Sequence, residues 1–80
     1  MDYSTMSISE IASLIYKDWG AKVNYAAKPY LEAMTTLESV KDNYYCDTGY
    51  SVIAYFLFNA RSWTGEVARA IKKELNKRLK

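Results

Sequence analysis

The chain has 80 residues and a formal net charge of +2, and half of its residues are apolar. This length makes one small domain, and the apolar fraction excludes a disordered tail. The absence of histidine removes the commonest general base and metal ligand, and the single cysteine, Cys46, excludes an internal disulfide.

The charge is distributed unevenly along the chain. Residues 1–60 carry four lysines against seven carboxylates, whereas residues 61–80 carry seven cations against two carboxylates. We therefore expect a basic C-terminal end on a mildly acidic body. The first residues lack the basic start and apolar core of a secretion signal, so a reducing, cytoplasmic location fits the chain best.

The first helix is predicted over residues 8–19. Ser7 and Glu10 have the spacing of a capping box, in which the serine oxygen accepts a free amide and the glutamate reaches back to the cap. Gly20 is a suitable stop, because glycine readily adopts the left-handed conformation that closes a helix. The apolar residues between them recur every three or four positions: Ile8, Ile11, Ala12, Ile15 and Trp19.

A second helix is predicted over residues 29–42, with Pro29 in its first turn, where the missing amide of proline is tolerated. Its apolar stripe comprises Tyr30, Ala33, Met34, Leu37 and Val40. Residues Asn43 to Gly49 then form a predicted non-helical loop, because turn-forming residues lie at both of its ends.

The third helix, predicted over residues 49–62 with Asp47 or Thr48 as its cap, is the centre of the expected fold. Its run Val52 to Phe58 is apolar or aromatic throughout, so we expect every side of this helix to be buried under the others. A strand is the alternative for so short a run, but no second strand-like segment exists to pair with it. The run is also too short for a membrane span, which needs about 20 residues.

A fourth helix is predicted over residues 64–79, with Thr64 as its cap and Glu66 near the positive end of the helix dipole. Arg78 falls on its apolar side, from which we expect the long side chain to reach solvent. The other side is basic and carries Arg69, Lys72, Lys73, Lys77 and Lys80. Together these segments predict a compact all-α domain of four helices around the buried helix at about 50–62.

Few residues are suited to catalysis. Cys46 has no histidine to form a thiolate, and Asp42 and Asp47, on either side of the tyrosine pair in the predicted loop, are more simply turn and cap residues. The three glycines lie too far apart to form a phosphate-binding loop. We therefore expect no enzyme activity, no metal and no cofactor.

The basic side of the fourth helix is the clearest electrostatic feature. Its five cations, Arg69, Lys72, Lys73, Lys77 and Lys80, could meet nucleic-acid phosphates. The short join at Gly65 is similar to a helix-turn-helix, although Arg61 lies near the corner where that motif favours a small residue. The simpler interpretation is a solvated surface, because lysine-rich helices are usually exposed.

Eight tyrosines are many for a chain of this length. Tyr44 and Tyr45 are adjacent in the predicted loop, and tyrosine is enriched at protein interfaces. One of them is expected to anchor a protein partner, while Asp42 or Asp47 pairs with a basic rim on that partner. The alternative is that both tyrosines fold over the small core.

The stretch Val52 to Leu75 contains Tyr55-Phe56-Leu57, Asn59-Ala60, Trp63, Gly65-Glu66, Ala68-Arg69 and Lys72 to Leu75. On these residues the chain resembles small helical proteins encoded by bacteriophages and prophages, and the likeness extends back to residues 29–34, about two thirds of the chain. The resemblance supplies no catalytic or ligand residues. It implies a phage accessory protein that binds a host or phage macromolecule, such as a counter-defence inhibitor of the anti-CRISPR kind. Protein binding is therefore the expected function, nucleic-acid binding is the alternative, and self-association is left open.

Overall fold

The computed structural model describes residues 3–44 and 47–79. Among these residues there are four α-helices: α1 (Ile8–Trp19), α2 (Lys28–Met34), α3 (Gly49–Phe58) and α4 (Glu66–Arg78). One-turn 3-10 helices lie on either side of α1, at Tyr3–Thr5 and Gly20–Lys22. The predicted all-α class with four helices is confirmed.

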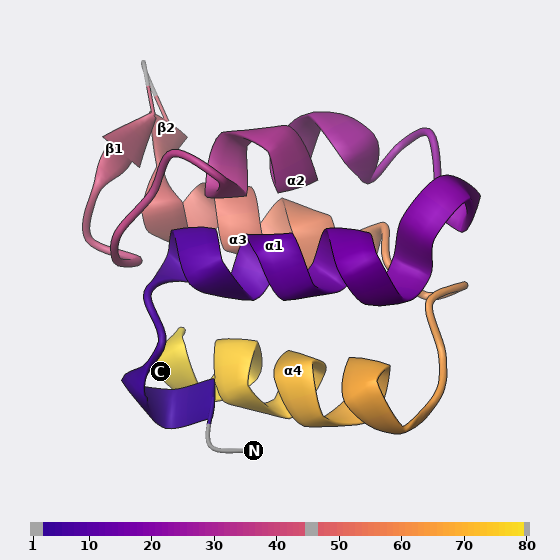
Figure 1. Ribbon diagram of the computed structural model, residues 1–80. Coiled ribbons are helices and arrows are strands. Elements are labelled where there is room, and N and C mark those ends of the chain that lie inside the picture. The colour runs from indigo at the N-terminus through magenta and orange to yellow at the C-terminus, as the bar shows by residue number, and fades with distance from the viewer. Residues whose placement is uncertain (1–2, 45–46, 80) are drawn as a thin grey trace.

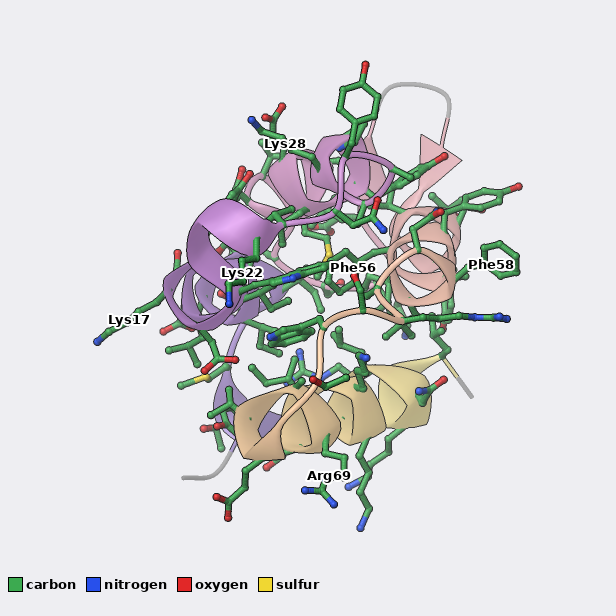
Figure 2. All side chains as sticks on the ribbon, turned by 90° about the vertical axis from the view of Figure 1, so that its right-hand side faces the viewer. Lys17, Lys22, Lys28, Phe56, Phe58 and Arg69 are labelled. Atoms are coloured by element: carbon green, nitrogen blue, oxygen red, sulfur yellow. The ribbon has the colours of Figure 1, made fainter. Side chains whose placement is uncertain are left out.

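The four helices alternate in direction around one core. α1 and α3 run the same way, while α2 and α4 run roughly opposite to them (Figure 1). Viewed along the helices, α1 and α3 lie on opposite sides with α2 above and α4 below, and Phe56 points into the space between them (Figure 2). The buried residues form one hydrophobic cluster to which every helix contributes, so the helices share a single core.

A minimal antiparallel hairpin leads into α3. Its strands are β1 (Asn43–Tyr44) and β2 (Asp47–Thr48), with Asn43 opposite Thr48 and Tyr44 opposite Asp47. The prediction that this segment is not helical is confirmed for its described part.

α1 begins and ends where the sequence predicts. The Ser7 hydroxyl accepts the Glu10 amide at 3.2 Å, and the Glu10 carboxylate accepts the Ser7 amide at 2.9 Å. Both bonds of the predicted capping box are therefore present. At the other end Gly20 has a positive φ of 63°, which glycine adopts at little cost.

The prediction of a second helix over residues 29–42 is wrong in length, since α2 has seven residues. Beyond it, the hydroxyls of Thr35 and Thr36 each donate to the carbonyl three residues earlier. Such side-chain bonds offer the backbone an alternative to the helix. The turns that follow still carry Leu37 and Val40 into the core, so the apolar stripe continues although the helix does not.

The segment after α2 also completes the start of α1. The amides of Ile8 and Ser9 donate to the carbonyls of Glu38 and Leu37 at 3.1 and 2.8 Å. The first amides of a helix have no partner within the helix, so these bonds satisfy two groups that would otherwise need water.

α3 begins as predicted but ends at Phe58 rather than at residue 62. Thr48 is its N-cap and accepts the amide of Ser51 at 3.2 Å. The Asn59 side chain donates to the carbonyl of Tyr55 at 2.9 Å, and this local bond competes with continuation of the helix.

α4 begins at Glu66, so the predicted cap Thr64 is wrong. Gly65 holds the N-cap position with a φ of 110° and supplies no side-chain bond. Such a φ is rare for residues with a Cβ, which is why glycine rather than threonine makes this turn.

Arg78 is half-buried and does not extend into solvent as expected. Its guanidinium donates to the Glu74 carboxylate at 2.7 Å and to the carbonyl of Tyr3 at 2.8 Å. It therefore ties the last turn of α4 to the segment that precedes α1, and is not part of a free basic surface.

Candidate protein-binding surface

α3 divides its apolar residues between two sides. Val52, Ile53 and Phe56 are at most 3% exposed, whereas Tyr55 is 55% and Phe58 is 67% exposed. The expectation that every side of this helix is buried is therefore wrong. Figure 2 shows Phe56 directed among the helices and Phe58 directed away from them. The reason is geometric, because four helices around one core each keep one side outward.

We define the aromatic surface of α3 as its four exposed apolar residues, Tyr50, Ala54, Tyr55 and Phe58. Tyr50, Ala54 and Phe58 are spaced by four residues and form one row along the helix. A shallow groove of about 450 Å³ is lined by three residues of this surface, Ala54, Tyr55 and Phe58, and by Asn59. α3 contains no charged residue, so the surface is apolar apart from two phenol hydroxyls.

Neighbouring side chains support two of the exposed rings. Tyr55 stacks on Tyr30, with the ring centroids 5.5 Å apart. The Arg61 guanidinium lies 5.2 Å from the centre of the Phe58 ring. Both geometries are attractive. Rings held in this way lose less conformational freedom when a partner covers them.

The predicted tyrosine site lies largely outside the described residues. Tyr45 lies outside them, and so do the side chains of Tyr44 and Asp47. The carboxylate of Asp42 accepts two backbone amides of the preceding turn at 2.9 and 3.3 Å. Asp42 therefore stabilises the turn, in agreement with the simpler interpretation. The role of Tyr44 or Tyr45 as an anchor for a protein partner stays a prediction.

The basic side of α4 is smaller than predicted. Lys72 is half-buried. Its ammonium donates to the backbone carbonyl of Trp63 and lies 5.7 Å from the centre of the indole ring of the same residue. Burial lowers the pKa of Lys72. Lys80 lies outside the described residues. The predicted cations that are exposed are spaced by four residues: Arg69, Lys73 and Lys77.

The join between α3 and α4 is not a helix-turn-helix. Residues 59–65 separate the two helices, whereas that motif uses a turn of about three or four residues. α3 and α4 also run in roughly opposite directions, while the motif crosses its helices at a steep angle (Figure 1).

Several carboxylates accept hydrogen bonds that stabilise the fold. Glu10, Asp42 and Glu74 accept the hydrogen bonds described above. Asp18 accepts the indole N–H of Trp63 at 2.9 Å, beside a groove of about 440 Å³ between the end of α1 and the α3–α4 connection. In the part of the chain that the structure describes, no three His, Cys, Asp or Glu side chains group as metal ligands.

Sequence reasoning missed the aromatic surface, although a signal for it was present. An amphipathic helix turns only one side to a core, so a run that is apolar throughout must leave some of its residues outward unless it is covered all round. Residues 50–58 contain two rows of four-residue spacing on opposite sides of the helix, Tyr50, Ala54 and Phe58 on one and Val52 and Phe56 on the other. The sequence shows that one row must face outward, and the structure shows that it is the first.

Comparisons of the chain with protein-family models, curated protein sequences and solved structures found no match. No family therefore assigns a role to the aromatic surface. Within the described residues, no helix has the length and apolar character needed to cross a membrane.

Proposed function

We propose that this chain is a small, non-enzymatic protein-binding module whose partner covers the aromatic surface of α3. The observation that carries the proposal is the exposure of Tyr55 and Phe58 on a helix without charged residues. Exposed aromatic rings leave apolar area in contact with water, and covering them is favourable. Buried aromatic anchors supply much of the binding energy in protein interfaces.

The border of the surface suits the same role. Asn59 lines the groove, and the Arg61 guanidinium lies over the Phe58 ring. A polar border around an apolar centre is the usual anatomy of a protein interface. The supported rings of Tyr55 and Phe58 favour this further, because a surface that is already ordered pays less entropy on binding.

The use of carboxylates by the fold supports a role without catalysis. Asp18, Asp42 and Glu74 each accept hydrogen bonds from the protein itself, so these carboxylates already hold parts of the fold together. The resemblance of residues 29–79 to small phage proteins favours an accessory role, such as a counter-defence inhibitor in a bacterial cytoplasm.

Affinity capture tests the proposal. Tagged wild-type chain, Phe58→Ser and Tyr25→Ser are used to retain proteins from a bacterial lysate, with and without nuclease treatment. Tyr25 is the matched control, because it is 93% exposed and belongs to the segment between α1 and α2 rather than to α3. We expect Phe58→Ser to lower retention about tenfold or more and Tyr25→Ser to leave it unchanged.

Two results would contradict the proposal. Retention that is equal for wild type and Phe58→Ser would exclude the aromatic surface as the contact. Retention that disappears on nuclease treatment would favour the alternative, nucleic-acid binding through Arg69, Lys73 and Lys77.

A further inference from the structure

The connections that follow α1 and α3 lie together at one end of the bundle, on the right in Figure 1. The segments that meet there, residues 17–28 and 59–72, carry six cations against two carboxylates, whereas the rest of the chain carries five cations against seven carboxylates. One of the two carboxylates, Asp18, accepts the indole N–H of Trp63. Folding therefore creates a basic end from two segments that are separated in sequence by residues 29–58.

Two grooves at the basic end share part of their lining. The groove of about 440 Å³ is lined by Lys22 of the first segment and by Trp63 and Thr64 of the second. A second groove, of about 290 Å³, is lined by the same Trp63 and Thr64 and also by Arg69. Figure 2 looks onto this end and shows Lys28, Lys22 and Arg69 from top to bottom. The grooves therefore link Lys22 to Arg69, and the three cations lie along one path across the end.

The cations of this path are not used by the fold. Within the described residues, none of the three forms an ion pair with a carboxylate. Lys28 is the first residue of α2, where the helix dipole disfavours a cation. We define the basic track as the exposed residues along this path, Lys22, Tyr25, Lys28, Ser62, Thr64 and Arg69.

Tyr25 adds an aromatic ring to the basic track. Its side chain is 93% exposed, and it lies three residues from Lys22 and three from Lys28 along the chain. Each unit of a single-stranded nucleic acid carries one phosphate and one base, so a ring between two cations matches this repeat. Unpaired bases stack on exposed aromatic rings, whereas the bases of a duplex already stack on one another.

We propose that the basic track binds a single-stranded nucleic acid, with phosphates paired to Lys22, Lys28 and Arg69 and a base stacked on Tyr25. The exposed hydroxyls of Ser62 and Thr64 can donate to phosphate oxygens between these cations. The inference goes beyond the proposed function and does not depend on it, because the basic track and the aromatic surface of α3 have no residue in common.

Salt dependence tests the phosphate contacts. Wild type is compared with two charge-matched double variants of exposed lysines, Lys22→Gln with Lys28→Gln on the track and Lys73→Gln with Lys77→Gln on α4. Fluorescence anisotropy follows binding of a labelled oligothymidylate of about 12 nucleotides. With three paired phosphates, raising the salt from about 50 to 200 mM should weaken binding roughly twentyfold for wild type and for the α4 variant. The track variant keeps one phosphate contact, so its binding should weaken only roughly threefold.

Two results of this comparison would overturn the proposed site. The first is a wild-type chain that does not bind the oligothymidylate at up to about 100 µM protein in about 50 mM salt. The second is an equal salt dependence for the two double variants, since the track would then contribute no more than the rest of the surface. Thermal melting should show both variants folded, because all four lysines are exposed.

The contribution of the ring is measured in the same assay. Tyr25→Ser should weaken oligothymidylate binding about fivefold or more, whereas Tyr50→Ser should leave it unchanged. Tyr50 is the control because it is exposed and lies at the start of α3, away from the basic end (Figure 1). Equal losses for the two variants would overturn the stacked base.

Two competing ligands test the choice of a single strand. At about 200 mM salt, where charge contributes less, the single strand should bind more tightly than its duplex with oligodeoxyadenylate and than an oligoglutamate of the same charge. A duplex that binds as tightly would overturn the preference for a single strand. An oligoglutamate that binds as tightly would overturn the nucleic acid in favour of an acidic protein segment.

The two proposals fail in different ways. If the oligothymidylate does not bind but nuclease-resistant capture of a protein depends on Phe58, the basic track is rejected and the proposed function stands. If the oligothymidylate binds through Lys22 and Lys28 but capture does not depend on Phe58, the proposed function is rejected and the track stands.

Discussion

α1 and α3 lie on opposite sides of the same core but meet solvent in different ways. Every apolar residue of α1's stripe is buried, and its outward positions include the exposed Ser13 and Lys17. The outward side of α3 instead carries Tyr55 and Phe58. Both helices contribute to the core, so stability alone does not explain the difference. A polar outer side is the ordinary solution, and the aromatic one is the basis of the proposal that another molecule covers it.

The contrast within α3 gives the largest expected effect. Phe56 is fully buried, and its ring lies 6.3 and 6.4 Å from those of Trp19 and Trp63. Phe56→Ala would leave a cavity among these rings, so we expect it to lower the free energy of unfolding by about 3–5 kcal/mol. Phe58→Ala removes the same atoms from the outer side and should change it by no more than about 0.5 kcal/mol. Urea unfolding measures both, and equal losses would contradict the division of α3 into two sides.

A second comparison is between Gly49, the first residue of α3, and an ordinary helix position on α4. Replacing glycine by alanine within a helix usually stabilises it by about 0.5–1 kcal/mol. At Gly49, however, a Cβ would lie 2.6 Å from the carbonyl oxygen of Val40. Because backbone must move to admit it, we expect Gly49→Ala to lower the free energy of unfolding by about 1–3 kcal/mol.

The exposed Ala70 of α4 provides the reference for this effect. Ala70→Gly should show the ordinary cost of glycine in a helix, about 1 kcal/mol. A Gly49→Ala variant that is more stable than wild type would mean that the backbone at Val40 does not pack closely against the start of α3.

The features that sequence predicted well depend on neighbours along the chain. The cap of α1 needs only Ser7 and Glu10, and its stripe needs only regular spacing. The end of α2 was predicted too late in the chain. The side-chain bonds of Thr35 and Thr36 compete with the helix there, whereas Leu37 and Val40 continue the helical spacing of apolar residues. A pattern of burial can therefore persist after the helix that suggested it has ended.

The features that sequence missed depend on contacts between distant segments. Lys72 has the position of a solvated lysine on α4, and only the folded chain brings the Trp63 carbonyl to its ammonium. Likewise, Ile8 and Ser9 donate to residues about 30 positions away, which no local pattern records. For α3, composition indicated that the helix is apolar but not which side of it the other helices cover.

The smallest expected effect compares the caps of α1 and α3. Both use a hydroxyl, from Ser7 and Thr48, but only α1 adds a carboxylate. The amide and hydroxyl of Ser7 bond to Glu10 and lower its pKa from the ordinary value of 4.5. The unfolded chain therefore binds this proton more readily than the folded chain. The stabilisation is fully present above about pH 4.5 and is lost as the pH falls through the lower, folded-state pKa.

Glu10→Gln isolates this contribution, because glutamine can still accept the amide of Ser7 but does not titrate. The difference in unfolding free energy between wild type and Glu10→Gln should be constant near neutral pH and should shift toward Glu10→Gln below about pH 4. The shift should be small, since Glu10 is fully exposed and water screens its charge. Urea unfolding from about pH 7 to pH 3 measures it, and Thr48→Ser is the control because it alters the cap of α3 without a titrating group. A difference that stays constant over the whole range would mean that the carboxylate of Glu10 does not hold the start of α1, and that both helices rely on their hydroxyl caps alone.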